Sequence, residues 1–136
     1  MHPEIEDEIL PYCLGEGIGV IVYSPMASGL LTGAMTRERA ARLPNDDWRS
    51  GHPDFTDPNL SRNLALVAVL GAIAKRHNRA VGEVAIAWTL HHPAVTGAIV
   101  GARNARQAEG VMRAGELLFT DEELNEIDTF FVETVA

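Results

Sequence analysis

The feature that most constrains the fold is the order of the apolar segments along the chain. Two short runs rich in β-branched residues, Gly19–Tyr23 and about Val95–Val100, stand among segments with helical periodicity. Continuous apolar runs of this length are typical of parallel strands that are covered on both faces. Alternation of such runs with helices indicates βαβ units. The sequence therefore predicts an α/β fold with two parallel strands and flanking helices.

Helices are expected before, between and after these two runs. Near the start, Pro3 and the acidic residues after it suit a helix N-terminus, Pro11 is expected to kink that helix, and Gly15 and Gly17 are expected to end it. Further helices are expected over Thr36–Leu43, from Asp57-Pro58 to His77, over Val81–His91, over Ala105–Gly115, and from the Thr120–Glu123 capping box to about Glu133. Between them, Pro44–Asn59 reads as a long polar loop, which is uncommon unless it is functional or mobile.

Composition excludes several classes of partner. The 136 residues carry a net charge of −8 and no basic stripe, so nucleic acid and anionic membranes would repel the chain. Cys13 is the single cysteine, which rules out an intrachain disulfide, and it is expected to be a buried, inert thiol. The start lacks a signal-peptide pattern, and no apolar run approaches the roughly 20 residues that span a bilayer. One domain in the cytoplasm is expected.

Familiar catalytic and metal-binding motifs are not found. Gly15-Glu-Gly-Ile-Gly19 precedes the first strand, whereas a dinucleotide fingerprint follows a strand and opens a helix. Gly29–Gly33 lacks the Gly-Lys-Ser/Thr ending of a P-loop. The adjacent His91 and His92 would point apart on a helix, and no HExxH or zinc-finger spacing occurs. No metal site is therefore predicted.

Small residues follow both strand candidates. The first strand runs into Ser24-Pro25 and a loop rich in glycine, and the second runs into Gly101 and then Arg103 at a helix start. Bare backbone lets N–H groups approach an anion closely, and the carboxyl ends of parallel strands are where α/β folds bind ligands. The two ends together suit a long anionic cofactor. The alternative, ordinary turn chemistry beside a solvated arginine, remains open on spacing alone.

Five stretches, in this order and spacing, resemble the C-terminal part of aldo-keto reductases. The resemblance is to the group whose motif reads Tyr-Ser-Pro-Leu, which includes the potassium-channel β subunits, and it covers nearly the whole chain. The matching stretches are Glu8-Ile-Leu-Pro-Tyr-Cys13, Gly17-Ile-Gly-Val-Ile-Val-Tyr-Ser-Pro25, Ser28-Gly-Leu-Leu-Thr-Gly33, Val84-Ala-Ile-Ala-Trp88, and Ile99-Val-Gly-Ala-Arg103 with Gln107.

The resemblance implies a (β/α)₈ barrel that binds NADP(H) in an extended pose, with residues 1–136 forming a partial domain. It implies that Tyr23 stacks on the nicotinamide, and an aromatic face is a suitable platform for a flat ring. It further implies a pyrophosphate cradle of Ser24, Pro25, Met26, Ala27 and Ser28, and a 2′-phosphate site of Ile99, Gly101, Arg103 and Gln107. The alternatives are a core tyrosine, turn-capping serines and a core isoleucine. Ala34 and Gly110-Val111 depart from the family pattern and remove polar contacts at the adenine end.

The family's catalytic tyrosine, lysine, histidine and aspartate come from the first half of the barrel, and the chain offers two strands of eight. The sole lysine, Lys75, is predicted at a helix end, and the tyrosines are Tyr12 in the first helix and Tyr23. No tyrosine with a neighbouring cation can be assembled at a strand end. We therefore predict no catalytic residues and no carbonyl reduction by the chain alone. The expected partner is an N-terminal half-barrel chain or a second copy, and the alternative is a non-catalytic nucleotide-binding or interaction module.

Overall fold

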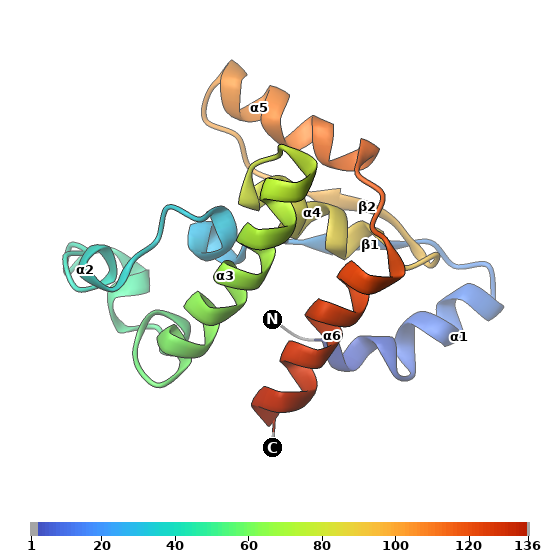
Figure 1. Cartoon of the computed structure of the whole chain (residues 1–136), viewed down its shortest axis with the longest axis horizontal. Coiled ribbons are helices and arrows are strands. Elements are labelled where there is room, and N and C mark those ends of the chain that lie inside the picture. Colours follow the sequence, from blue (N-terminus) through green and yellow to red (C-terminus); the bar gives the residue numbers. More distant parts are fainter. Residues whose placement is uncertain (1–2, 136) are drawn as a thin grey trace.

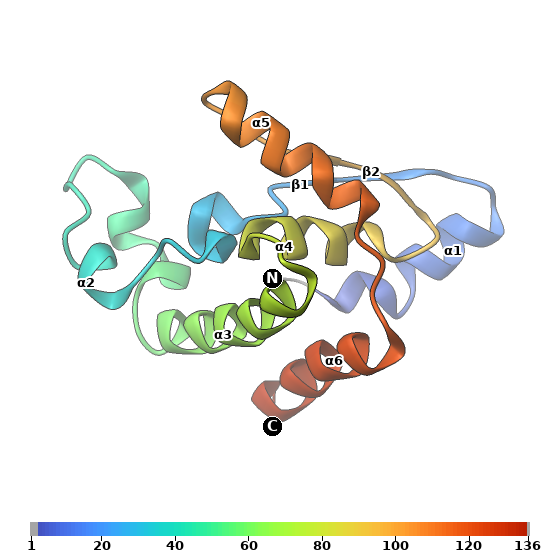
Figure 2. The same ribbon diagram turned by 45° about the horizontal axis from the view of Figure 1, so that its top comes forward.

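The computed structural model describes residues 3–135, arranged in layers behind a small sheet (Figures 1 and 2). Strands β1 (Val20–Tyr23) and β2 (Val95–Ile99) pair in parallel, with Tyr23 opposite Ile99 at the carboxyl end. Helix α4 (Val81–Leu90) lies directly beneath the sheet, and α3 (Asn59–His77) and α6 (Asp121–Val135) lie beneath α4. The predicted α/β class and the parallel pairing are confirmed.

The main core lies between α3, α4 and α6. Helix α4 is buried on every side from Gly82 to Trp88, because it is enclosed by the sheet on one side and by the two helices on the other. The indole of Trp88 stacks on Phe131 of α6, with ring centroids 5.4 Å apart. The other fully buried side chains of this cluster include Leu66, Leu70, Ile73, Val84 and Ile127.

A buried carboxylate joins α6 to the end of α3. Glu123 and Thr120 form the predicted capping box, with Thr120 N–H donating to Glu123 Oε2 over 3.1 Å. Glu123 is 4% exposed and also accepts hydrogen bonds from Arg76 Nε at 3.1 Å and His77 Nε2 at 2.8 Å. Burial alone would raise the pKa of Glu123, but the hydrogen bonds from His77, Thr120 and Arg76 outweigh it and lower the pKa to about 2.

The opposite face of the sheet is open, which corrects the expectation that both strands are covered on both faces. Ile21, Tyr23 and Ile99 point away from α4 and are 65%, 80% and 62% exposed. The continuous apolar run predicted burial because both faces carry large side chains. The described residues supply a layer for one face only, so the second apolar face lies on the surface.

The N-terminal region contains a break instead of one kinked helix. A short turn over Pro3–Glu6 is followed by α1 (Ile9–Gly15). The break at Asp7–Glu8 lies before Pro11, because the proline ring clashes with the carbonyl four residues earlier. Cys13 is a free thiol of intermediate burial, not the buried residue expected.

The long segment after β1 has more structure than a polar loop. It contains α2 (Arg37–Ala40) and turns over Trp48–Gly51 and Pro53–Phe55. Phe55 is buried against a second cluster formed by Leu30, Met35, Ala40 and Leu60.

After β2, α5 (Ala105–Met112) leads into a turn over Arg113–Glu116, where one helix was expected. None of the helices in the described part of the chain is long and apolar enough to cross a membrane.

Candidate cofactor-binding site

The carboxyl ends of β1 and β2 lie side by side. The register pairs Tyr23 with Ile99, so the loop after Tyr23 and the loop containing Gly101 and Arg103 leave the same edge of the sheet. Tyr23 and Ile99 are largely exposed, so the alternative of a core tyrosine and a core isoleucine does not hold in this structure. Parallel pairing thus brings together two segments that are more than 70 residues apart in sequence.

The loop after β1 has an unusual backbone. Ser24, Ala27 and Ser28 have φ angles of 54°, 46° and 55°, and Gly29 follows with 93°. Left-handed φ is uncommon for residues with a side chain. Successive backbone amides in such conformations form concave arrangements that bind anions. The predicted phosphate loop therefore has a backbone suited to that role.

Most side chains of this loop point into the protein. Pro25 is buried, and the Sδ atom of Met26 lies 3.3 Å from the position that a Cβ on Gly82 would occupy. Ala27 packs against both core clusters. Only Ser24 and Ser28 are exposed, and their hydroxyls cap no turn among the described residues. Among the five residues from Ser24 to Ser28, Pro25, Met26 and Ala27 can therefore offer only main-chain groups to a ligand.

Two amides of the loop have no acceptor among the described residues. Ala27 N–H donates to the Ser24 carbonyl, and Gly29 and Leu31 donate to the Met26 carbonyl. The amides of Met26 and Ser28 find no acceptor within residues 3–135. Donors without partners at a strand end fit the pyrophosphate of a dinucleotide, whose oxygens accept such hydrogen bonds.

The loop after β2 is held by caps of α5. Asn104 caps the helix, its Oδ1 accepting from Gln107 N–H at 2.9 Å, and the Gln107 side-chain oxygen accepts from Arg103 N–H at 2.8 Å. The oxygen of Gln107 is thus used internally, while its amide group remains a possible donor. The Arg103 guanidinium is exposed and contacts no carboxylate among the described residues. Gly101 has open space where a side chain would stand.

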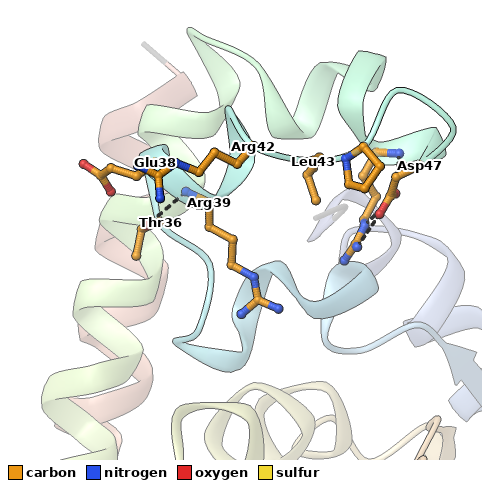
Figure 3. A pocket seen from close by; sticks show the side chains of 8 residues that line it. Thr36, Glu38, Arg39, Arg42, Leu43 and Asp47 are labelled. Carbon is orange, nitrogen blue, oxygen red and sulfur yellow. Dashed lines mark hydrogen bonds and ion pairs between the residues drawn. The ribbon is translucent and has the colours of Figure 1, made fainter.

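A pocket of about 480 Å³ flanks the loop after β1 on the side of α2 (Figure 3). Arg39 extends from α2 and donates to the Ala34 carbonyl at 3.1 Å. Arg49 donates to the Ser28 carbonyl at 3.3 Å and is paired with Asp47 at 2.6 Å. Arg49 therefore contacts the loop after β1 at Ser28, and Arg39 contacts the chain farther on, at Ala34. The full lining is Thr36, Glu38, Arg39, Arg42, Leu43, Pro44, Asp47 and Arg49.

Sequence reasoning missed Asp47 and Arg49. They lie in the segment read as a polar loop, 21 residues from Ser28 for Arg49. Hydrogen bonds from the side chain and then the backbone N–H of Arg49 lower the pKa of Asp47 to about 2. The local Asp-x-Arg spacing signals a turn with a side-chain cap, but nothing in it indicates contact with the loop after β1. Within residues 3–135, no group of three or more His, Cys, Asp or Glu residues could hold a metal ion.

Comparison with known proteins gives a consistent result. The aldo/keto reductase family model matches residues 1–131. The chain is 31% identical over 134 residues to the aldo-keto reductase YhdN of Bacillus subtilis (strain 168), covering 98% of this chain and 40% of that protein. It is 28% identical over 124 residues to probable aldo-keto reductase 1 of Glycine max, covering 91% and 35% respectively.

A solved structure agrees with these sequence relatives. The glycerol dehydrogenase AKR11B4 of Gluconobacter oxydans superposes with a TM-score of 0.84 at 34% identity, covering 96% of this chain and 39% of that one. The chain thus spans about two-fifths of the length of the relatives that it matches. On the family match and the structural agreement, the chain belongs to the aldo/keto reductase family.

Proposed function

We propose that this chain is the C-terminal, NADP(H)-binding part of an aldo/keto reductase, with residues 1–136 forming a portion of a (β/α)₈ barrel. The observation that carries the proposal is the pairing of Tyr23 with Ile99, which sets two ligand-facing loops at one sheet edge. In α/β barrels the active site lies at this end of the strands. Members of this family use nicotinamide cofactors.

Each loop has its own role in this proposal. The exposed Tyr23 ring stacks on the nicotinamide, and the Ser24–Ser28 loop binds the pyrophosphate mainly through backbone amides. Ile99 and Gly101 border the adenosine end, where Arg103 and Gln107 hold the 2′-phosphate. The free guanidinium of Arg103 favours NADP over NAD, because it has a charge-assisted interaction to offer.

The chain by itself is proposed to be inactive in carbonyl reduction. The bound cofactor would supply the hydride, but the proton donor needs a tyrosine with a depressed pKa beside a cation. Tyr12 lies on α1 and Lys75 at the end of α3, and neither borders the loops after β1 and β2. NADPH oxidation with an aldehyde, measured for the purified chain, is expected to match the buffer blank. A rate that depends on the chain would contradict this part of the proposal.

Binding tests the central proposal directly. We expect NADPH to bind to the purified chain in calorimetry, and the Arg103→Gln variant to bind it about tenfold more weakly. Arg106 is also exposed on α5 and serves as the matched control, so Arg106→Gln is expected to keep the affinity. Absence of binding at millimolar NADPH, or equal losses in both variants, would contradict the proposed role of Arg103.

A second candidate is an interaction module, and the open sheet face favours it. Ile21 and Ile99 are exposed side chains on a face that α4 does not cover. We propose that the remaining barrel elements, on an N-terminal half-barrel chain or in a second copy, cover this face. Co-expression with the N-terminal portion of a relative is expected to give a complex that Ile21→Ser weakens.

We also propose a cytoplasmic location, which suits a chain with one cysteine.

A further inference from the structure

The loop after β1 holds three consecutive residues in the left-handed region. Ala27, Ser28 and Gly29 have φ angles of 46°, 55° and 93°. Glycine adopts such angles without strain, but residues with a Cβ persist there only when their surroundings hold them. Core packing holds Ala27, and hydrogen bonds within the loop hold its amide and that of Gly29. A contact to Ser28 from outside the loop adds a further restraint.

Arg49 is placed to supply that restraint. Its Nη1 donates to the Ser28 carbonyl at 3.3 Å. Its Nε and Nη2 donate to the two carboxylate oxygens of Asp47 at 2.9 and 2.6 Å, a fork-to-fork pair that fixes the plane of the guanidinium. The guanidinium also lies 5.9 Å from the centre of the Phe55 ring. Because the other two nitrogens are held, Nη1 has a defined direction toward Ser28.

The residues that hold Arg49 are themselves anchored. Phe55 is 5% exposed and packs in the cluster that contains Leu30, which belongs to the same loop. Asp47 also accepts from the backbone N–H of Arg49 at 3.1 Å, which fixes the turn at Trp48–Gly51. The core packing of Phe55 and the turn capped by Asp47 therefore hold Arg49 in position for its contact with Ser28.

Arg49 and Arg39 differ in what they bring to the loop. Asp47 compensates the positive charge of Arg49. Arg49 therefore affects the loop mainly by fixing the position of the Ser28 carbonyl, and less by its electrostatic field. Arg39 contacts the Ala34 carbonyl and has no carboxylate partner among the described residues.

We propose that Arg49 is a positioning residue for the phosphate loop. It holds the Ser28 carbonyl on the α2 side, and so keeps the amides of Met26 and Ser28 free of internal acceptors. This inference rests on the proposed function for its effect on the cofactor. The effect on the loop itself is independent of any ligand.

The test compares Arg49→Ala with Arg49→Lys and with a matched control. Arg37 is the control because its guanidinium joins Asp57 at 2.8 Å and Ser61 at 2.6 Å in the same region, without touching the loop after β1. Hydrogen exchange of the peptide spanning residues 24–34 is measured without ligand, and NADPH affinity is measured by calorimetry. Thermal unfolding of all three variants shows whether each is folded.

In Arg49→Ala, exchange in residues 24–34 is expected to speed up about tenfold and NADPH binding to weaken about tenfold. Arg49→Lys is expected to recover part of both losses, because one ammonium can reach Ser28 but cannot pair bidentately with Asp47. Arg37→Ala is expected to leave both readouts within twofold of the unchanged chain. If Arg49→Ala fails to fold, Asp47→Asn takes its place, with smaller changes in the same direction.

The outcomes separate this inference from the proposed function. Exchange in Arg49→Ala equal to that in Arg37→Ala would overturn the positioning role. Faster exchange with unchanged NADPH affinity would support the positioning of the loop by Arg49 and overturn its contribution to cofactor binding. Faster exchange in a chain that binds no NADPH even when unchanged would support the positioning of the loop and contradict the proposed function.

Discussion

The two faces of the β1–β2 sheet differ sharply in their surroundings. On one face α4 packs against the strands, and α3 and α6 enclose α4, so every residue of α4 from Gly82 to Trp88 is buried. On the other face Ile21, Tyr23 and Ile99 are more than half exposed. The difference shows that the described residues cover one face by themselves, while the other face presents apolar side chains on the surface.

The largest effect is expected from a cavity on the covered side. Ile73 of α3 is fully buried among the side chains of the main core. Ile73→Ala should lower the free energy of unfolding by about 3–4 kcal/mol, because it removes buried methyl groups and leaves a cavity. Urea unfolding followed by circular dichroism measures the change. A loss below about 1 kcal/mol would show that the helical layer is less tightly packed than described.

A smaller loss is expected where α6 joins α3. Glu123→Gln should lower the free energy of unfolding by about 2 kcal/mol, because it weakens the hydrogen bonds from His77, Thr120 and Arg76. The pKa of Glu123 is about 2, below the 4.5 of an unperturbed group, so its contribution is present above pH 4.5 and is lost as the pH falls toward 2. The free energies of unfolding of the unchanged chain and of Glu123→Gln, measured as the pH is lowered, should therefore converge near pH 2. Parallel curves would contradict this account.

The next largest loss of stability is expected at the turn that leads from the loop after β1 toward α2. Gly33 has a φ of 78°, and an added Cβ would lie 3.0 Å from Cγ2 of Val81 at the start of α4. Gly33→Ala should lower stability by about 1–2 kcal/mol, since both the left-handed angle and the contact oppose a side chain. Gly51 has open space at its Cβ position and serves as the control. Thermal unfolding of both variants checks the difference.

The smallest effect on stability is expected on the open face. Ile21→Ser should change the free energy of unfolding of the chain by less than about 0.5 kcal/mol, because the side chain is 65% exposed. Its effect should appear in association, as reduced mass in analytical ultracentrifugation at high concentration or weaker capture of an N-terminal half-barrel. A destabilisation as large as that of Ile73→Ala would mean that the face is buried within the chain.

Local sequence patterns determined much of the fold. The two strand runs, the Thr120–Glu123 capping box and the helices α3, α4 and α6 follow from periodicity and caps, which depend on neighbours within a few residues. Parallel pairing followed from the alternation of elements, and with it the adjacency of the loops after Tyr23 and Ile99. The position of these candidate site residues at one sheet edge was therefore predictable, whereas their binding role stays a proposal.

Tertiary structure alone decided that one sheet face is open and that the loop after β1 has left-handed backbone angles. An apolar run predicts burial but cannot show whether a second layer exists, so the exposure of Ile21 was not predictable. The left-handed angles of Ala27 and Ser28 run against the preference of residues with a Cβ, and the Ser28 carbonyl accepts a hydrogen bond from Arg49, 21 positions away in sequence. Sequence patterns report local preferences and periodic faces. Contacts between distant segments are chosen by packing, which no short pattern records.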